Sequence, residues 1–202
     1  MTTHKQRNAQ TESAIVDALV KIGHDKPLSQ ITVTDLIKTT GISRGTFYLH
    51  YLDKEDLIEQ LKNQFMSKFK KTLANEMGNT MNLQELANGD PYPVLIDVLS
   101  PVAKNRSLLA FLFGANGDAP FYRTIVNELQ IAILHKLRTI KGTVTFCREV
   151  PQTYAINLVT NTIVSTIMVW LTDNDKLTSN ELAHVIMREL YLSPYQILEI
   201  DS

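Results

Sequence analysis

The sequence predicts an all-α fold, and three observations support this prediction. Its 202 residues include only seven prolines and eight glycines, so helix breakers are scarce. Apolar residues recur every three or four positions, and no valine-rich segment alternates apolar and polar residues as a strand would. Hydrophobic residues make up 44% and charged residues 20%, which is ordinary for a globular protein with a buried core. We expect about nine helices.

The first two expected helices carry clear start and stop signals. Apolar residues at helical spacing predict a first helix over residues 5–22, which Gly23 ends. Thr32 is a good N-cap for the second helix, with Asp35 three residues later as its capping-box partner. Gly41 ends this helix and can adopt the left-handed conformation that a tight turn needs.

A short third helix and a long fourth helix follow at once. Ser43 is the expected N-cap of a helix over residues 44–51, and Asp53 is that of a helix over residues 54–75. The second and third helices therefore have the layout of a helix-turn-helix, in which the later helix enters the major groove of DNA.

The short helix divides into an inner and an outer face. Helical spacing places Phe47 inside, with Ile42, and makes Tyr51 at least half-buried. Gly45 has no side chain, so the backbone there can approach a phosphate closely. Lys54 lies at a helix start, where free backbone N–H groups also favour phosphate. The side chains expected to face DNA are those of Arg44, Thr46, Tyr48 and His50, with Arg44 able to read guanine.

The remainder of the chain forms a second expected domain. We place a helix-turn-helix domain at residues 1–54, linked by the helix at 54–75 to a C-terminal domain at 76–202. The polar stretch 78–89 is the expected boundary. The C-terminal helices are expected at about 92–105, 106–115, 119–140, 151–172 and 179–192.

The helix at 151–172 is uncharged and long enough to span a bilayer. Amide and hydroxyl side chains interrupt it, and a spanning helix would have to desolvate them. They include those of Gln152, Asn157, Thr160, Asn161, Thr162, Ser165 and Thr166. No cluster of lysine or arginine flanks it to set an orientation. We therefore expect a buried helix and no membrane association.

Charge is distributed unevenly along the chain. Residues 1–75 contain eleven Lys+Arg and eight Asp+Glu, a net of +3, whereas residues 76–202 contain nine and thirteen, a net of −4. The excess of positive charge coincides with the helix-turn-helix. Because it is small, we expect DNA binding to depend on individually placed contacts more than on bulk charge.

The sequence contains no pattern that indicates catalysis. A zinc-protease motif, a glycine-rich phosphate loop and a nucleophile elbow are all absent from it. The five histidines form no i,i+4 pair, and the one cysteine, Cys147, excludes an internal disulfide. We expect no enzyme activity, metal or cofactor, and we interpret Cys147 as an incidental thiol. No charged-then-apolar leader opens the chain, so a cytoplasmic protein is expected.

Residues 6–60 resemble the N-terminal domain of the TetR family of bacterial transcriptional regulators. The matching residues are Thr32-Val33, Gly41-Ile42-Ser43, Thr46-Phe47-Tyr48, His50-Tyr51 and Asp53 to Leu57. The resemblance implies a three-helix DNA-binding domain joined to a helical regulatory and dimerisation domain. It implies DNA contact by Thr46, Tyr48, His50 and Lys54, with Thr34 near the backbone. The full expected DNA-binding set is Thr32, Thr34, Arg44, Gly45, Thr46, Tyr48, His50 and Lys54.

The resemblance also implies a homodimer that binds a roughly palindromic operator. Family members usually pair through their last two long helices, here about 151–172 and 179–192, although ordinary monomer core is the alternative. Residues Phe111 to Leu129 resemble a subgroup that includes the co-activator of dihydroxyacetone kinase operons. Repression is the expected mode of regulation, and activation stays open.

A small-molecule effector of unknown identity is the further expectation from the family. Polar or aromatic groups within apolar helices would line its pocket, or they would cap and bridge helices in the core. The alternative is a DNA-bound interaction protein or co-activator whose C-terminal domain binds a protein. The candidate ligand-binding residues are Phe111, Arg123, Tyr154, Asn157, Asn161 and Trp170.

Overall fold

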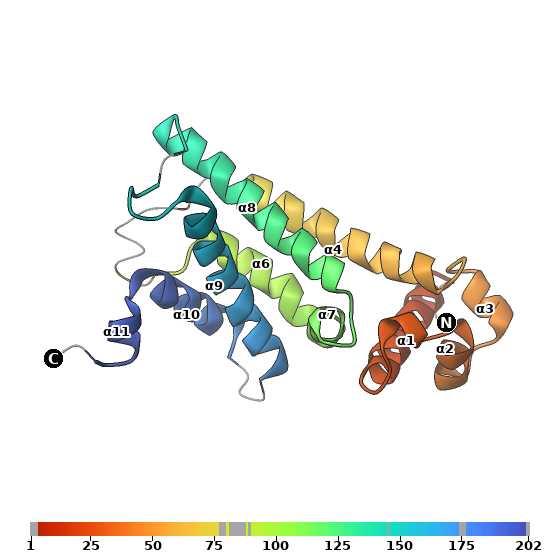
Figure 1. Ribbon diagram of the computed structural model, residues 1–202. Coiled ribbons are helices and arrows are strands. Elements are labelled where there is room, and N and C mark those ends of the chain that lie inside the picture. The colour runs from red at the N-terminus through yellow and green to blue at the C-terminus, as the bar shows by residue number, and fades with distance from the viewer. Residues whose placement is uncertain are drawn as a thin grey trace. The chain divides into compact units, whose positions relative to one another are not determined.

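A computed structural model describes residues 4–76, 80, 88, 90–144, 146–173 and 177–200. Within these ranges it contains helices and no strand, which confirms the all-α prediction (Figure 1). The elements are α1 (His4–Gly23), the 3-10 helix η1 (Leu28–Gln30), α2 (Val33–Thr40), α3 (Arg44–Tyr48), α4 (Lys54–Glu76), α6 (Pro93–Lys104), α7 (Arg106–Phe113), α8 (Ala119–Lys141), α9 (Gln152–Thr172), α10 (Ser179–Tyr191) and α11 (Pro194–Ile197).

All nine expected helices are present among the described residues. The structure adds α11, a single turn that was not expected, whose N-cap Ser193 forms a capping box with Gln196. The expected boundary at 78–89 lies outside the described residues, apart from residues 80 and 88.

Internal contacts divide the chain into two units. Unit one comprises Met1–Met66 and Ser107–Tyr122, and unit two comprises Ser67–Arg106 and Arg123–Ser202. The segment Ser107–Tyr122 contains most of α7. Its contacts therefore assign it to the same unit as the N-terminal helices.

The core of unit one is built around α1 and α2, which pack against each other. Ile15, Leu19, Leu36, Phe47 and Leu57 are completely buried there. Burial of side chains of this size contributes about 1.5–3 kcal/mol each. These residues hold α3 and the start of α4 in place, so the candidate site rests on a packed scaffold.

The loop between α7 and α8 is tied to the connection between α1 and η1. The Leu28 N–H donates to the Asn116 carbonyl at 2.8 Å. The Asn116 side-chain amide donates to the carbonyls of Gly23 and His24 at 3.2 and 3.3 Å. A Cβ atom at Gly23 would lie 2.2 Å from the Phe111 ring, so glycine allows α7 to pack closely there.

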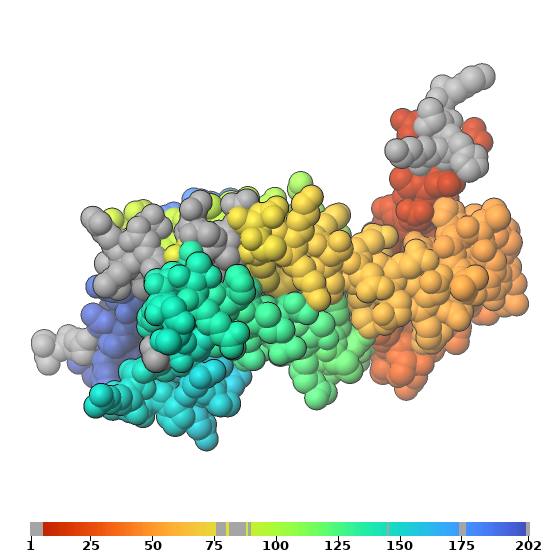
Figure 2. Space-filling view, turned by 90° about the horizontal axis from the view of Figure 1, so that it is seen from above, coloured from red at the N-terminus to blue at the C-terminus, as the bar shows by residue number. Residues whose placement is uncertain are grey.

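In unit two, α10 packs on both α6 and α9. Leu182, Ala183, Ile186 and Met187 of α10 are almost completely buried. The C-terminal part of α4 runs alongside α8 (Figures 1 and 2), and the Lys70 Nζ lies 2.6 Å from the Glu128 Oε1. The described part of this unit is therefore a layered helical bundle.

Arg106 closes the C-terminal end of α9. Its guanidinium donates to the Leu171 carbonyl at 3.2 Å, to the Asp173 carbonyl at 2.7 Å, and to the Trp170 carbonyl. The guanidinium also lies 5.2 Å from the centre of the Trp170 ring. A cation at this position satisfies carbonyls that the helix leaves unpaired and complements the helix dipole.

Candidate nucleic-acid interface

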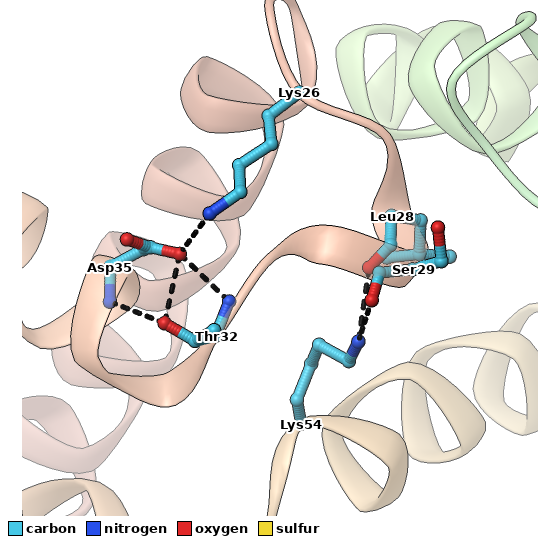
Figure 3. Close-up of polar contacts among 6 residues, drawn as sticks. All are labelled: Lys26, Leu28, Ser29, Thr32, Asp35 and Lys54. Atoms are coloured by element: carbon cyan, nitrogen blue, oxygen red, sulfur yellow. Dashed lines mark hydrogen bonds and ion pairs between the residues drawn. The ribbon is translucent and has the colours of Figure 1, made fainter.

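The start of α2 is fixed by the expected capping box (Figure 3). The Thr32 hydroxyl accepts from the Asp35 N–H at 3.2 Å, and the Asp35 carboxylate accepts from the Thr32 N–H at 2.9 Å. The Thr32 hydroxyl also donates to this carboxylate at 2.8 Å. Thr32 therefore acts as a helix cap, and both the donor and the acceptor of its hydroxyl are engaged.

An ion pair reinforces this cap. The Lys26 Nζ lies 2.7 Å from the Asp35 Oδ2 (Figure 3). The hydrogen bond from Lys26, together with those from Thr32, lowers the pKa of Asp35 to about 2. The carboxylate is thus charged at neutral pH and links the α1–η1 connection to α2.

The turn between α2 and α3 has the expected geometry. Gly41 has a φ of 73°, in the left-handed region, and its N–H donates to the Ile37 carbonyl at 2.9 Å. The Ser43 hydroxyl accepts from the Thr46 N–H at 3.0 Å and caps α3. These two residues set the angle at which α3 leaves α2.

The helix α3 is shorter than the sequence suggested. It ends at Tyr48, whereas the expected helix extended to residue 51. The N–H groups of His50 and Tyr51 both donate to the Phe47 carbonyl at 3.0 Å, so the last turn tightens. This bend returns the Tyr51 ring to the core, where it is buried against Phe47 as expected.

The outer face of α3 displays several of the expected DNA-binding residues. Tyr48 is 49% exposed, and Arg44 and Gly45 are exposed. The Arg44 guanidinium donates to the hydroxyl of the exposed Thr34 at 3.2 Å, which links α3 to α2. Thr46 is half-buried, and its hydroxyl lies 2.8 Å from that of the cap, Ser43.

His50 is placed differently from the expectation that its side chain faces outward. The His50 side chain is 10% exposed, and its Nδ1 lies 3.3 Å from the Glu12 Oε1 of α1. The tight turn after Tyr48 directs the imidazole toward α1. The expectation of a projecting His50 is therefore wrong.

Lys54 is engaged by its own unit as well. Its side chain is 13% exposed, and its Nζ lies 3.2 Å from the Glu55 carboxylate. The Lys54 ammonium donates to the carbonyls of Leu28 and Ser29 at 3.0 and 3.4 Å (Figure 3). In this structure, Lys54 joins the start of α4 to η1.

Two exposed leucines next to α3 were not among the expected site residues. Leu49 is 85% exposed and Leu52 is 79% exposed. The available signal was the inward position of Phe47, because a helical residue two places later points away from the core. An exposed apolar side chain beside Tyr48 enlarges the surface that α3 offers.

The six candidate ligand-binding residues occupy different environments. Phe111 is buried in unit one against Gly23, whereas the other five belong to unit two. Tyr154 and Asn161 lie on the exposed side of α9, and Arg123 is exposed on α8. Trp170 is buried beneath Arg106, and its Nε1 donates to the Leu177 carbonyl at 2.8 Å.

Asn157 takes part in a polar cluster between α8 and α9. The Gln130 side-chain amide donates to the side-chain Oδ1 of Asn157 at 3.1 Å and to the Thr160 hydroxyl at 3.3 Å. Thr160 is completely buried and also donates to the Ile156 carbonyl at 2.8 Å. Polar groups inside an apolar helix pair are therefore bonded to each other here.

Unit one contains an open groove of about 540 Å³ between η1, α4 and the α7–α8 loop. The Lys62 Nζ in this groove lies 2.6 Å from the Glu59 carboxylate and 2.9 Å from that of Asp118. Burial opposes the charge on Lys62, but these hydrogen bonds outweigh it and raise the pKa of the ammonium. The charged residues that line the groove include these paired side chains, and none of the six candidate ligand-binding residues lines it.

By length and composition α9 is apolar enough to cross a membrane, and a third of its most apolar window is buried. A core helix of a globular protein passes the same test, so this is weak support for a membrane span. Among the described residues, no group of three or more His, Cys, Asp or Glu side chains is placed to hold a metal ion.

Comparison with known proteins identifies the class of this chain. Residues 15–61 match the family model of bacterial regulatory proteins of the tetR family, and residues 89–190 match that of a transcriptional regulator C-terminal region. The chain therefore belongs to the TetR family of transcriptional regulators, with an N-terminal helix-turn-helix DNA-binding domain. The fold and the family are those of regulators, which are not enzymes.

Two curated relatives are similar over part of their length. The HTH-type transcriptional regulator AcrR of Shigella flexneri is 25% identical over 101 residues, which are 50% of this chain and 44% of the relative. An HTH-type transcriptional regulator of Haemophilus influenzae is 30% identical over 76 residues, or 37% and 41% of the two chains. The matched stretch thus spans less than half of each relative.

Solved structures share the fold over almost the whole chain. A TetR transcriptional regulator from Streptococcus agalactiae is 22% identical with a TM-score of 0.54, covering 93% of this chain and 97% of that one. The fatty acid degradation regulator FadR from Bacillus halodurans is 20% identical with a TM-score of 0.58, covering 91% and 96%. The resemblance of Phe111–Leu129 to the dihydroxyacetone kinase subgroup stays a prediction.

Proposed function

We propose that this TetR-family chain is a cytoplasmic homodimeric repressor that an effector releases from a roughly palindromic operator. The observation that carries the DNA-binding part is the outward face of α3, which stands on a completely buried Phe47. In a helix-turn-helix dimer, each such helix enters one major groove, so the two half-sites are separated by about one helical turn or a multiple of it.

The residues of this face have distinct roles in the proposal. Tyr48 and Arg44 contact base edges or phosphates, and Gly45 lets the backbone approach the DNA closely. Thr34 and Thr46 supply hydroxyls at the edges of the face. Thr32 acts by holding the start of α2.

His50 and Lys54 contact phosphate in the proposal only after exchanging partners. His50 gives up Glu12, and Lys54 gives up the carbonyls of Leu28 and Ser29. For Lys54 this exchange is favourable because a charged phosphate is a stronger acceptor for an ammonium than a neutral carbonyl is. Lys54 would also exchange its ion pair with Glu55, and His50 would exchange one anion, the Glu12 carboxylate, for another.

The proposed dimer forms through α9 and α10. One side of α9 presents an exposed strip without charge, which contains Tyr154, Leu158, Asn161, Ser165 and Val169. Leu158 is 69% exposed and Tyr154 is 71% exposed. Interface cores are depleted in charge and enriched in aromatic side chains, so this strip suits a partner helix.

The proposed effector binds in the C-terminal domain and acts by favouring one of two conformers of the dimer. Gln130, Asn157 and Thr160 place a few polar groups within the apolar helices of this domain, as ligand sites do, and an effector there would compete for the hydrogen bonds that join them.

The second candidate function is a co-activator whose C-terminal domain binds another protein. The exposed apolar side chains after α10 favour it, namely those of Tyr195, Ile197, Leu198 and Ile200. A repressor and a co-activator are distinguished by transcription from the selected operator in a purified polymerase system, where the first lowers and the second raises product.

Selection of duplexes from a random library with the full-length protein tests the proposal. The expected result is one enriched motif with two inverted half-sites and two chains bound per duplex. Enrichment of no motif, or of an asymmetric motif bound by one chain, overturns it.

A further inference from the structure

Apolar side chains are prominently exposed at the end of the helix-turn-helix. Leu49, the C-cap of α3, is 85% exposed, and Tyr48 beside it is 49% exposed. Leu52, in the turn that follows, is 79% exposed. Single exposed leucines are common on protein surfaces. Here, however, they extend the face that the proposed function directs toward DNA.

Leu49 is held on this face by the last turn of α3. Its backbone has right-handed helical angles, with φ −73° and ψ −22°, and its N–H donates to the Gly45 carbonyl at 3.1 Å. Residues 45, 48 and 49 therefore share one side of the helix, opposite the buried Phe47. Gly45 offers open space there, since a Cβ at this position would lie no closer than 3.8 Å to a neighbouring atom.

This side of α3 presents no charged group. Gly45, Tyr48 and Leu49 can supply one phenol and one branched alkyl group, and the nearby Arg44 guanidinium is bonded to Thr34. A branched alkyl group forms no hydrogen bonds with base edges. In the major groove, the one apolar feature that distinguishes bases is the C5 methyl group of thymine.

We propose that Leu49 is a specificity-determining residue that contacts the methyl group of a thymine in each half-site. The proposal rests on the proposed function, because it requires α3 to lie in the major groove. Leu52 is not assigned this role. Its N–H donates to the Asp56 carboxylate at 2.9 Å, so its backbone belongs to the start of α4.

The test removes the methyl group from the DNA and the alkyl group from the protein in turn. The probe is the duplex that full-length protein selects from a random library, with each thymine replaced singly by deoxyuridine. Affinity is measured for the natural sequence, Leu49→Ala and the matched control Leu52→Ala. Removing one buried methyl group lowers affinity about fourfold for each half-site.

We expect one thymine position in each half-site where replacement by deoxyuridine weakens binding of the natural sequence and of the Leu52→Ala variant. The same replacement should not change the affinity of the Leu49→Ala variant. Leu49→Met restores most of the sensitivity, because the side chain stays apolar. Equal sensitivity in the natural sequence and Leu49→Ala, or no sensitive position at all, overturns the role of Leu49. Failure of the natural sequence to bind any selected duplex overturns the proposed function itself.

Discussion

The Lys54 ammonium donates to the Leu28 carbonyl at 3.0 Å, so the first residue of α4 is fastened to η1 (Figure 3). The same side chain is a proposed phosphate contact. One residue therefore connects the internal stability of unit one to the binding of DNA, and the two roles have separate measurable consequences.

Replacing Lys54 with alanine is expected to have both consequences. Loss of a charged hydrogen bond lowers the free energy of unfolding by about 1.5–3 kcal/mol. Loss of one phosphate contact reduces the slope of log affinity against log salt by about one unit. Denaturant unfolding measures the free energy of unfolding, and mobility shifts at several salt concentrations measure the slope. A normal slope with lowered stability would restrict Lys54 to the internal contact.

Gly45→Ala is expected to raise stability while it weakens DNA binding. Nothing in the chain obstructs a Cβ atom there, and alanine favours helix by about 0.5–1 kcal/mol over glycine. We expect a more stable protein that binds the operator more weakly, because the added methyl group separates α3 from DNA. Gly41→Ala is the control: with φ at 73°, it destabilises the fold. Undiminished affinity of Gly45→Ala would show that no close approach occurs at this position.

Asp35 is expected to contribute to stability above acidic pH. The pKa of its carboxyl is about 2 in the folded chain, below the ordinary value of about 3.9 in an unfolded one. Its contribution is therefore complete above about pH 4 and is lost as the pH falls from there toward 2. Thermal unfolding between pH 7 and 2.5 should show a smaller acid-induced loss for Asp35→Asn than for the natural sequence. Parallel curves would exclude the Lys26 pair as a source of stability.

Leu158→Glu is expected to convert the proposed dimer to monomers. Leu158 projects from α9, so a charge there does not disturb the core of its own chain but would be buried in the interface. The neighbouring Val159 is half-buried, so a glutamate there would disturb both the core of its own chain and the proposed interface. Sedimentation velocity measures the mass, with the exposed Ile131→Glu of α8 as the comparison. An intact Leu158→Glu dimer would place the interface elsewhere.

The local signals in the sequence were sufficient for the helix-turn-helix. Thr32, Gly41 and Ser43 form their hydrogen bonds with residues three or four positions away. Spacing alone therefore predicted the cap and the turn that the structure contains. Contacts between distant residues were beyond such reasoning. The covering of His50 by Glu12 joins positions 38 residues apart, and the tie from Asn116 to Gly23 joins positions 93 apart.

Leu49 was not among the expected site residues, although helical spacing places it opposite the buried Phe47. Its exposure follows from the tight turn after Tyr48, where Leu49 caps the helix while Tyr51 returns to the core. A pattern of apolar residues does not distinguish a leucine that is buried from one that is displayed.

The affinity of Tyr48→Ala for the selected operator tests the central claim most directly, namely that the outward face of α3 binds duplex DNA. Because Tyr48 is half-exposed and contacts the buried Phe47 ring only edge-on, the substitution should lower the unfolding midpoint slightly and leave the dimer unchanged. We expect about five- to 150-fold weaker binding in a mobility-shift titration, which corresponds to the roughly 1–3 kcal/mol that a good base contact contributes. Full affinity for the operator, in a variant with normal folding, would contradict it.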